Sequence, residues 1–435
     1  MSSTQIIVMA IFGIFGIIAV LMFSGIIPGF GPGGGGQVIT PVVSIWGFFD
    51  SANLRDTIDD LNNKNEGVFK IVYTQKNSQT YESEIVDALA SGTGPDLWFI
   101  SQDTLLKNRN KLYLISFASY PKKNFFATFI DGSEVFIDEK EQGIWALPFA
   151  IDPMVLYWNR DMFSSAAISD YPKYWDEFLV DVGLLTKLDG AGNIIRSGVA
   201  MGEYKNIKNA KGILSMLMHQ SGNPVIESGT NKVVIDKENT SVIGRPADNA
   251  LRFFNEFSNL KQVNYSWNRS LSDSDLMFAN SSLAMYFGYA SELKNILAKN
   301  PHLNFSIAEV PQQRDGAIKT THGKFYGLAI SKNTKNIQAS SAVLTSMTNK
   351  EYSGYFSQIL TLAPARRDLL GEGAEDLVTS VIYKSAVMAK TWPEPDQKEA
   401  SIIFQSMIES TTTGKRLISE AVREASARLK NLLEQ

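Results

Sequence analysis

Strand-like and helix-like patterns alternate in the first part of the chain, and this alternation constrains the fold more than any other feature. Three apolar strand-like runs are separated by two amphipathic helical patterns, in the order 42–46, 51–65, 69–75, 81–90 and 94–100. Such alternation is typical of an α/β fold with a parallel, doubly wound sheet. Ligands bind such sheets at the carboxyl ends of the strands, where Trp46 and Asp103 lie. Ser51 is expected to cap the first helix.

The second half of the chain repeats this style without repeating the sequence. Strand-like runs at 197–201, 282–288, 305–311 and 325–331 alternate with helical patterns. The later part of the chain has helical patterns at 336–349, 352–361, 374–389 and 414–433. A chain of 435 residues is too long for one ordinary hydrophobic core. The sequence therefore predicts two lobes.

An apolar run opens the chain. Residues 6–27 carry no charge and, as a helix, would span roughly 30 Å, the thickness of a membrane core. A cleaved signal peptide is the alternative, but no Lys or Arg precedes the run and no A-x-A site follows it. We therefore expect a retained single-pass anchor at 1–27, followed by a flexible Gly/Pro linker at 28–37.

Composition excludes several functions. The net charge of −4 argues against nucleic-acid binding, and the absence of cysteine excludes disulfides, thiol catalysis and zinc–cysteine sites. His219, His302 and His322 are far apart in the sequence, so no metal site and no cofactor are expected. His322 lies among glycines with no acidic neighbour, which is typical of a turn.

Residues 147–163, LPFAIDPMVLYWNRDMF, place one acid, Asp152, inside an apolar run. Together with four further segments, this stretch resembles the extracellular solute-binding proteins of ABC importers, in the sugar-binding branch that includes the maltose-binding proteins. The other four segments, ALASGTGPDLWFISQD, PKYWDEF, LMFANSSLAMYFGYAS and GKFYGLAISKNTKN, follow the family's order and spacing between residues 88 and 339.

The resemblance implies a two-lobed periplasmic-binding-protein-like α/β fold of type II, attached here to the N-terminal transmembrane helix. It implies a first lobe formed by 38–150 and 304–364, and a second formed by 151–303 and 365–435. A ligand would lie between the lobes. Residues 147–163 would be the first strand to cross between them, which would put Asp152 at the floor of the cleft or make it a hinge residue that caps a local turn.

The resemblance also implies candidate ligand-binding residues, each of which could instead be structural. They are Trp46, Asp103, Asp152, Glu203, Tyr204, Tyr286, Tyr289 and Trp392. Next to Asp103, the aromatic and basic residues of maltose-binding proteins are replaced by Ile100 and Thr104, which argues against maltose itself. Acids combined with aromatic rings suit hydroxyl groups and apolar sugar faces.

Three functions remain open. The first is a bacterial, membrane-tethered, monomeric and non-enzymatic receptor on the extracytoplasmic side. It would capture an oligosaccharide or related polyol by hinge closure and pass it to an ABC permease. The second is a sensor or surface interaction protein with the same fold, suggested by the partial loss of sugar-site residues. The third is a glycan hydrolase using Asp103 and Asp152, which would have to lie about 5–10 Å apart.

Overall fold

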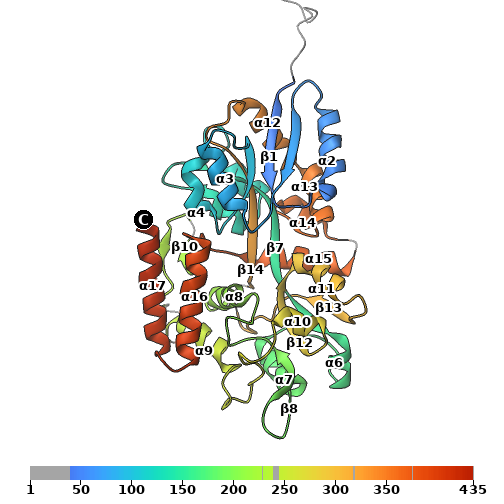
Figure 1. The fold of residues 1–435 in the computed structure, drawn as a ribbon, viewed down its shortest axis with the longest axis vertical. Coiled ribbons are helices and arrows are strands. Elements are labelled where there is room, and N and C mark those ends of the chain that lie inside the picture. Colours follow the sequence, from blue (N-terminus) through green and yellow to red (C-terminus); the bar gives the residue numbers. More distant parts are fainter. Residues whose placement is uncertain (1–39, 228, 239–243, 317–318, 375, 435) are drawn as a thin grey trace, which may run out of the picture.

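The computed structural model describes residues 40–227, 229–238, 244–316, 319–374 and 376–434. The predicted anchor and linker lie outside these ranges, and within them no helix has the length and apolar character needed to cross a membrane. The described chain forms two lobes, one above the other, joined by the long strands β7 (Leu147–Asn159) and β14 (Thr321–Ile330) (Figure 1).

The first lobe begins with the predicted alternation of strands and helices. Its elements are β1 (Val42–Gly47), α2 (Ser51–Lys64), β2 (Lys70–Gln75), α3 (Tyr81–Ala90) and β3 (Leu97–Ser101). Strand β1 pairs in parallel with both β2 and β3, as predicted. The expected helix cap was wrong by one residue, because Asp50 takes an extended conformation and its carboxylate accepts the backbone N–H of Ala52.

Shorter elements and helices from later in the chain complete the first lobe and the region next to the crossing strands. They are α4 (Leu105–Asn108), η1 (Arg109–Lys111), β4 (Ile115–Ser116), α5 (Lys122–Thr128), η2 (Asp131–Phe136), β5 (Ile137–Asp138), β6 (Gly143–Ile144), α12 (Ile337–Met347), α13 (Lys350–Leu360), β15 (Ala363–Pro364), α14 (Arg367–Glu372), α15 (Leu377–Met388) and β16 (Ala389–Lys390).

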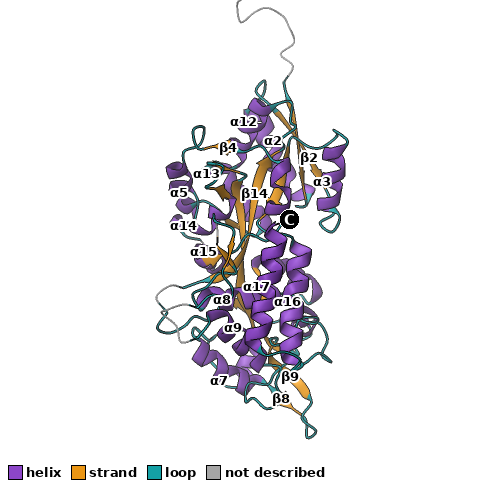
Figure 2. Ribbon diagram, turned by 90° about the vertical axis from the view of Figure 1, so that its left-hand side faces the viewer, coloured by secondary structure: helices purple, strands orange, loops and turns teal. Residues whose placement is uncertain are grey.

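The second lobe contains most of the middle of the chain and its C-terminal helices. Its elements are α6 (Arg160–Ser165), α7 (Trp175–Leu185), β8 (Lys187–Leu188), β9 (Ile194–Val199), α8 (Ala210–Gln220), β10 (Ile226–Glu227), β11 (Lys232–Val233), α9 (Pro246–Glu256), α10 (Ser274–Ala279), β12 (Leu283–Tyr289), η3 (Ala290–Glu292), α11 (Leu293–Lys299), β13 (Phe305–Ala308), α16 (Gln397–Thr412) and α17 (Ile418–Glu434). Helices α16 and α17 lie side by side along this lobe (Figure 2).

Strand β7 belongs to both lobes, which explains the apolar run that surrounds Asp152. Its residues 147–153 pair with β14, and residues 154–159 pair with β12 and β13. Because β7 has a partner on each side and helices over its faces, twelve of its thirteen residues are buried. The sheets of the two lobes are therefore joined into one path of hydrogen-bonded strands, in the order β2-β1-β3-β14-β7-β12-β9-β8.

The boundaries of the two lobes given above remain a prediction. The strand pairing suggests one change to them. Strand β13 pairs with β7 in the stretch that also carries β12, so residues 305–308 lie with the second lobe. We propose that the chain returns to the first lobe along β14, rather than near residue 303.

Candidate functional site

A cavity of about 310 Å³ lies between the two lobes, next to the crossing strand β14. The residues that line it come from the end of β3, the start of α8, the end of β12, β14 and the C-terminal segment that leads into α16. They are Gln102, Asp103, Tyr204, Lys205, Ile207, Lys208, Asn209, Ala210, Lys211, Gly212, Tyr289, His322, Lys324, Glu394, Gln397 and Ser401. Most of the side chains are polar or charged, and both lobes contribute.

His322 and Lys324 reach the cavity from the same face of β14, because alternate residues of a strand point to the same side. The prediction of a turn at His322 was wrong. Its segment is a strand, held by pairing of Gly323 with Pro153 and of Lys324 with Asp152, partners that are distant in the sequence. Burial lowers the pKa of His322 well below its usual value, so the imidazole is neutral at pH 7.

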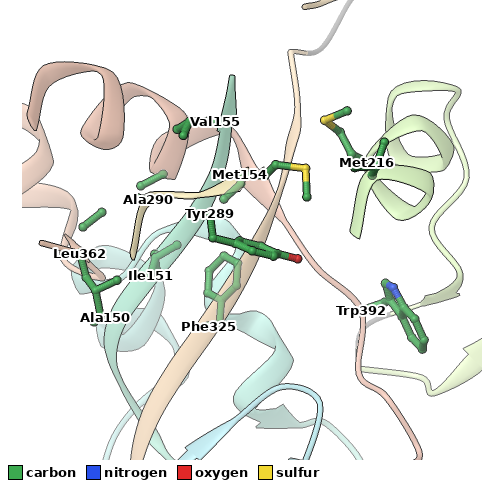
Figure 3. Packing of buried hydrophobic residues seen from close by; sticks show 14 of the residues in the cluster. Ala150, Ile151, Met154, Val155, Met216, Tyr289, Ala290, Phe325, Leu362 and Trp392 are labelled. Carbon is green, nitrogen blue, oxygen red and sulfur yellow. The ribbon is translucent and has the colours of Figure 1, made fainter. Parts of the chain in front are cut away.

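Tyr289 occupies the cavity wall opposite the start of α8. Its hydroxyl lies 3.1 Å from Nδ1 of His322, and the ammonium of Lys324 lies 4.0 Å from the centre of its ring. Figure 3 shows the Tyr289 ring beside Phe325, with its hydroxyl directed away from β7. Gly212 permits this approach, since a Cβ at that position would lie 2.4 Å from the tyrosine oxygen.

Lys211 and Glu394 form a buried ion pair at the cavity wall. Their side chains are 20% and 4% exposed. Burial raises the pKa of Glu394 to about 7, although Lys211 opposes this shift. Burial also opposes the charge of Lys211, but Glu394 and Asp103 outweigh it and raise the lysine pKa. The lysine therefore stays charged, and the carboxyl group titrates near neutral pH.

Asp103 is held by contacts from both lobes. One of its oxygens accepts from Nε2 of Gln397 at 2.8 Å, and the other accepts the hydroxyl of Ser101. Next to this contact, Lys107 and Asp396 form an ion pair of 2.8 Å, and the backbone N–H of Glu394 donates to the carbonyl of Gln102. The segment 394–397 thus ties the second lobe to the end of β3 in the first.

Asp152 lies next to the cavity but does not line it. Its side chain is fully buried, and its two oxygens accept the backbone N–H and the hydroxyl of Ser291 at 2.9 and 2.6 Å. Burial raises the pKa of Asp152, against the opposing effects of Lys324 and Ser291. In this structure Asp152 therefore joins β7 to the turn after β12, which is distant in the sequence and differs from the local turn that the structural alternative expected.

The eight predicted site residues divide into two groups. The structure brings Asp103, Tyr204 and Tyr289 together around the cavity. Trp46 lies outside it, with the ammonium of Lys76 3.8 Å from its ring centre.

Besides Asp152, three candidates remain, and each has a partner outside the cavity. Glu203 pairs with Arg269. The Tyr286 hydroxyl donates to Glu292, while the buried Trp392 donates its indole N–H to Ser215. Whether any of these eight residues binds a ligand stays a prediction.

Most of the charged residues of the cavity were not predicted from the sequence, above all Lys211, Lys324 and Glu394. Lys324 lies in GKFYGLAIS, one of the segments that resembled the sugar-binding branch, and the alternation of β14 would have placed it on the same face as His322. Glu394 lies two residues after Trp392, in a segment that was considered only for its aromatic residue. Lys211 carried no signal, because a lysine near the start of a helix is usually exposed.

The fold and the cavity define a class of two-lobed binding proteins, and comparison with known sequences gives the family. The sequence profile of the bacterial extracellular solute-binding proteins matches residues 56–377. The chain therefore belongs to this family, and its two-lobed domain is extracytoplasmic. A protein of Brucella abortus (strain 2308), named as a binding protein, is 22% identical over 357 residues, which cover 80% of this chain and 82% of that protein.

Solved structures of sugar-binding proteins share the fold. The cyclic α-maltosyl-1,6-maltose binding protein of Arthrobacter globiformis has a TM-score of 0.72 at 15% identity, and covers 91% of this chain and 99% of its own. The sugar-binding protein of Xanthomonas citri has a TM-score of 0.72 at 15% identity, with 90% and 97% covered. A solute-binding protein of Thermotoga lettingae, bound to α-D-tagatose, has a TM-score of 0.66 at 19% identity, with 91% and 100% covered.

Proposed function

We propose that this protein captures a saccharide or related polyol in the cavity between its lobes and delivers it to the permease of an ABC importer. Closure of the lobes about β7 and β14 would enclose the solute, driven by contacts that form only when both lobes touch it. Residues 1–27 would hold the domain at the outer face of the membrane, as a monomer and without catalytic activity.

One observation carries this proposal: a single cavity collects polar side chains from both lobes. Asp103 comes from the first lobe, Tyr204 comes from the second, and Tyr289 ends the β12 strand that pairs with β7. Carboxylates accept hydrogen bonds from sugar hydroxyls, and tyrosine rings offer an apolar face to a sugar ring. The relatives of the same fold include proteins whose names specify sugars.

A sensor or interaction protein is the second candidate, and one observation favours it. Gln397 already occupies an oxygen of Asp103 across the lobes. If this contact is permanent, the cleft cannot exchange it for a solute hydroxyl, and the domain would present a fixed closed surface to a partner.

A thermal-shift screen of the purified full-length chain separates the two candidates. The probes are neutral and acidic saccharides, polyols, amino acids and inorganic phosphate. A saccharide present at 100 times its Kd should stabilise the folded chain by about 2.7 kcal/mol. The transport proposal expects stabilisation by at least one saccharide or polyol and none by amino acids. No shift with any saccharide or polyol would overturn it and leave the sensor.

A further inference from the structure

The charges that line the cavity are predominantly positive. Lys205, Lys208, Lys211 and Lys324 face two acids, Asp103 and Glu394. A site built for neutral sugar hydroxyls alone has no need of so many cations, because each ammonium must be desolvated when a ligand covers it.

Two of the four lysines are neutralised within the chain. Lys211 pairs with Glu394, and Lys208 pairs with Glu292 at 3.0 Å. The other two, Lys205 and Lys324, form no ion pair within 4.0 Å among the described residues, and Lys324 is only near the charges of Asp152 and Glu394. Lys205 is exposed at the cavity edge, whereas Lys324 is partly buried on β14 at the cavity wall.

No described acid forms a close ion pair with Lys324, although the charges of Asp152 and Glu394 act on it from a longer distance. Asp152 is opposite it in the strand register, but both oxygens of Asp152 are taken up by Ser291. The ring of Tyr289 faces the ammonium group of Lys324, but the ring is not an anion. Lys324 is therefore a preformed cation in a polar cavity, with donor capacity left for a ligand.

Two neighbours favour a negative group at the same place. Helix α8 begins at the cavity, so the positive end of its backbone dipole faces it. His322 adds a ring nitrogen two residues before Lys324 on the same face of β14 and carries no charge of its own. Asp103 and Glu394 oppose an anion, but Lys211 pairs with Glu394, and Gln397 and Ser101 donate hydrogen bonds to Asp103.

Resting on the proposed function, we propose that the solute is an anionic saccharide, with a carboxylate or phosphate group bound by Lys324 and hydroxyl groups near Asp103 and Tyr204. Charge-assisted hydrogen bonds are about twice as strong as neutral ones. An anionic sugar should therefore bind about tenfold more tightly than its neutral counterpart. This preference should weaken as salt is added, because Lys324 is only partly buried.

Isothermal titration calorimetry on the full-length chain tests this inference with D-glucose, D-glucuronate, glucose 6-phosphate and inorganic phosphate. We expect glucuronate or glucose 6-phosphate to bind about tenfold more tightly than glucose. The relative affinity of the two identifies the anionic group as carboxylate or phosphate. Lys324→Met should reduce the preference to near one, whereas Lys324→Arg should retain it.

Lys332→Met is the matched control, because it removes the same charge from an exposed site just after β14 and outside the cavity. It should keep the preference for the anionic sugar. Equal affinities for charged and neutral sugars, or an unchanged preference in Lys324→Met, would overturn the inference and leave saccharide capture intact. If inorganic phosphate bound as tightly as glucose 6-phosphate, the sugar would add nothing to the affinity. That result would overturn the claim that the solute is a saccharide. An absence of binding by all three sugars would overturn this inference, whereas the proposed function is overturned only if the thermal-shift screen also shows no saccharide or polyol that binds.

Discussion

Lys211→Met is expected to lower the free energy of unfolding by about 3 kcal/mol near pH 7.5. The substitution keeps the apolar stem of the lysine and removes its charge, which leaves the carboxylate of Glu394 buried without its ion-pair partner. Burial and the charge of Asp103 already raise the pKa of Glu394, so its ionised form is costly in the folded state. Urea denaturation followed by tryptophan fluorescence measures the loss.

The loss of stability in Lys211→Met should also depend on pH, and the raised pKa of Glu394 determines the direction of this dependence. Glu394 has a higher pKa in the folded than in the unfolded state, so its protonation favours folding and its ionisation opposes it. Lowering the pH to about 5.5 protonates Glu394 and removes the unpaired charge, and the difference between variant and parent should shrink. A difference that grows as the pH falls would contradict this explanation.

The double variant Lys211→Met with Glu394→Gln is the matched control. It removes both charges together and leaves no unpaired ion, so it should recover about 2 kcal/mol relative to Lys211→Met alone. If the double variant is as unstable as the single one, the loss comes from packing and not from the ion pair.

Asp152→Ala is expected to destabilise the chain by about 2 kcal/mol and to change the affinity for a bound saccharide less than about twofold. The fully buried carboxylate accepts two hydrogen bonds from Ser291, and both are lost with the side chain. The side chain does not line the cavity. Measuring the denaturation midpoint and the saccharide affinity of the same preparation separates the two effects.

Asp152→Asn serves as the control for shape and charge. Burial raises the pKa of Asp152, so ionisation of this carboxyl group opposes folding, and an amide oxygen can still accept one bond from Ser291. We expect a loss of less than about 1 kcal/mol. A large fall in affinity in either variant, with the denaturation midpoint unchanged, would show that Asp152 contacts the solute directly.

Local sequence patterns predicted much of the fold. The alternation of strand-like and helix-like patterns between Val42 and Ile100 predicted the parallel strands of the first lobe. Such patterns can be recognised because they depend only on residues close together in the chain. Helix α3 was predicted with its observed bounds. The crossing strand β7 could be proposed only from the resemblance to a family, since a continuous apolar run does not reveal which lobe it belongs to.

Elements that depend on distant partners were harder to predict. Strand β14 begins four residues before the strand expected at 325, because its first residues pair with β16 and with the middle of β7. Helix α16 was not predicted, although Asp396 caps it through the N–H groups of Lys398 and Glu399. Both segments contribute to the cavity, so their omission hid His322, Lys324 and Gln397.

The candidate site was predicted only in part for a related reason. Trp392 and Tyr286 were selected because aromatic residues often contact sugars, but residue type does not distinguish a ring that lines a cleft from one that packs in a core. Trp392 stacks on Phe404, with the two ring planes 12° apart, and Tyr286 stacks on Phe278. Lys211 and Glu394 meet only after folding, so their pairing leaves no mark in either local sequence.

A crystal structure of the full-length chain with the saccharide that most stabilises it tests the central claim most directly. We expect the sugar in the cavity beside β14, within about 3.2 Å of polar atoms from both lobes, including Asp103 from the first and Tyr204 from the second. A sugar bound to one lobe alone, or at a site outside this cavity, would contradict capture between the lobes.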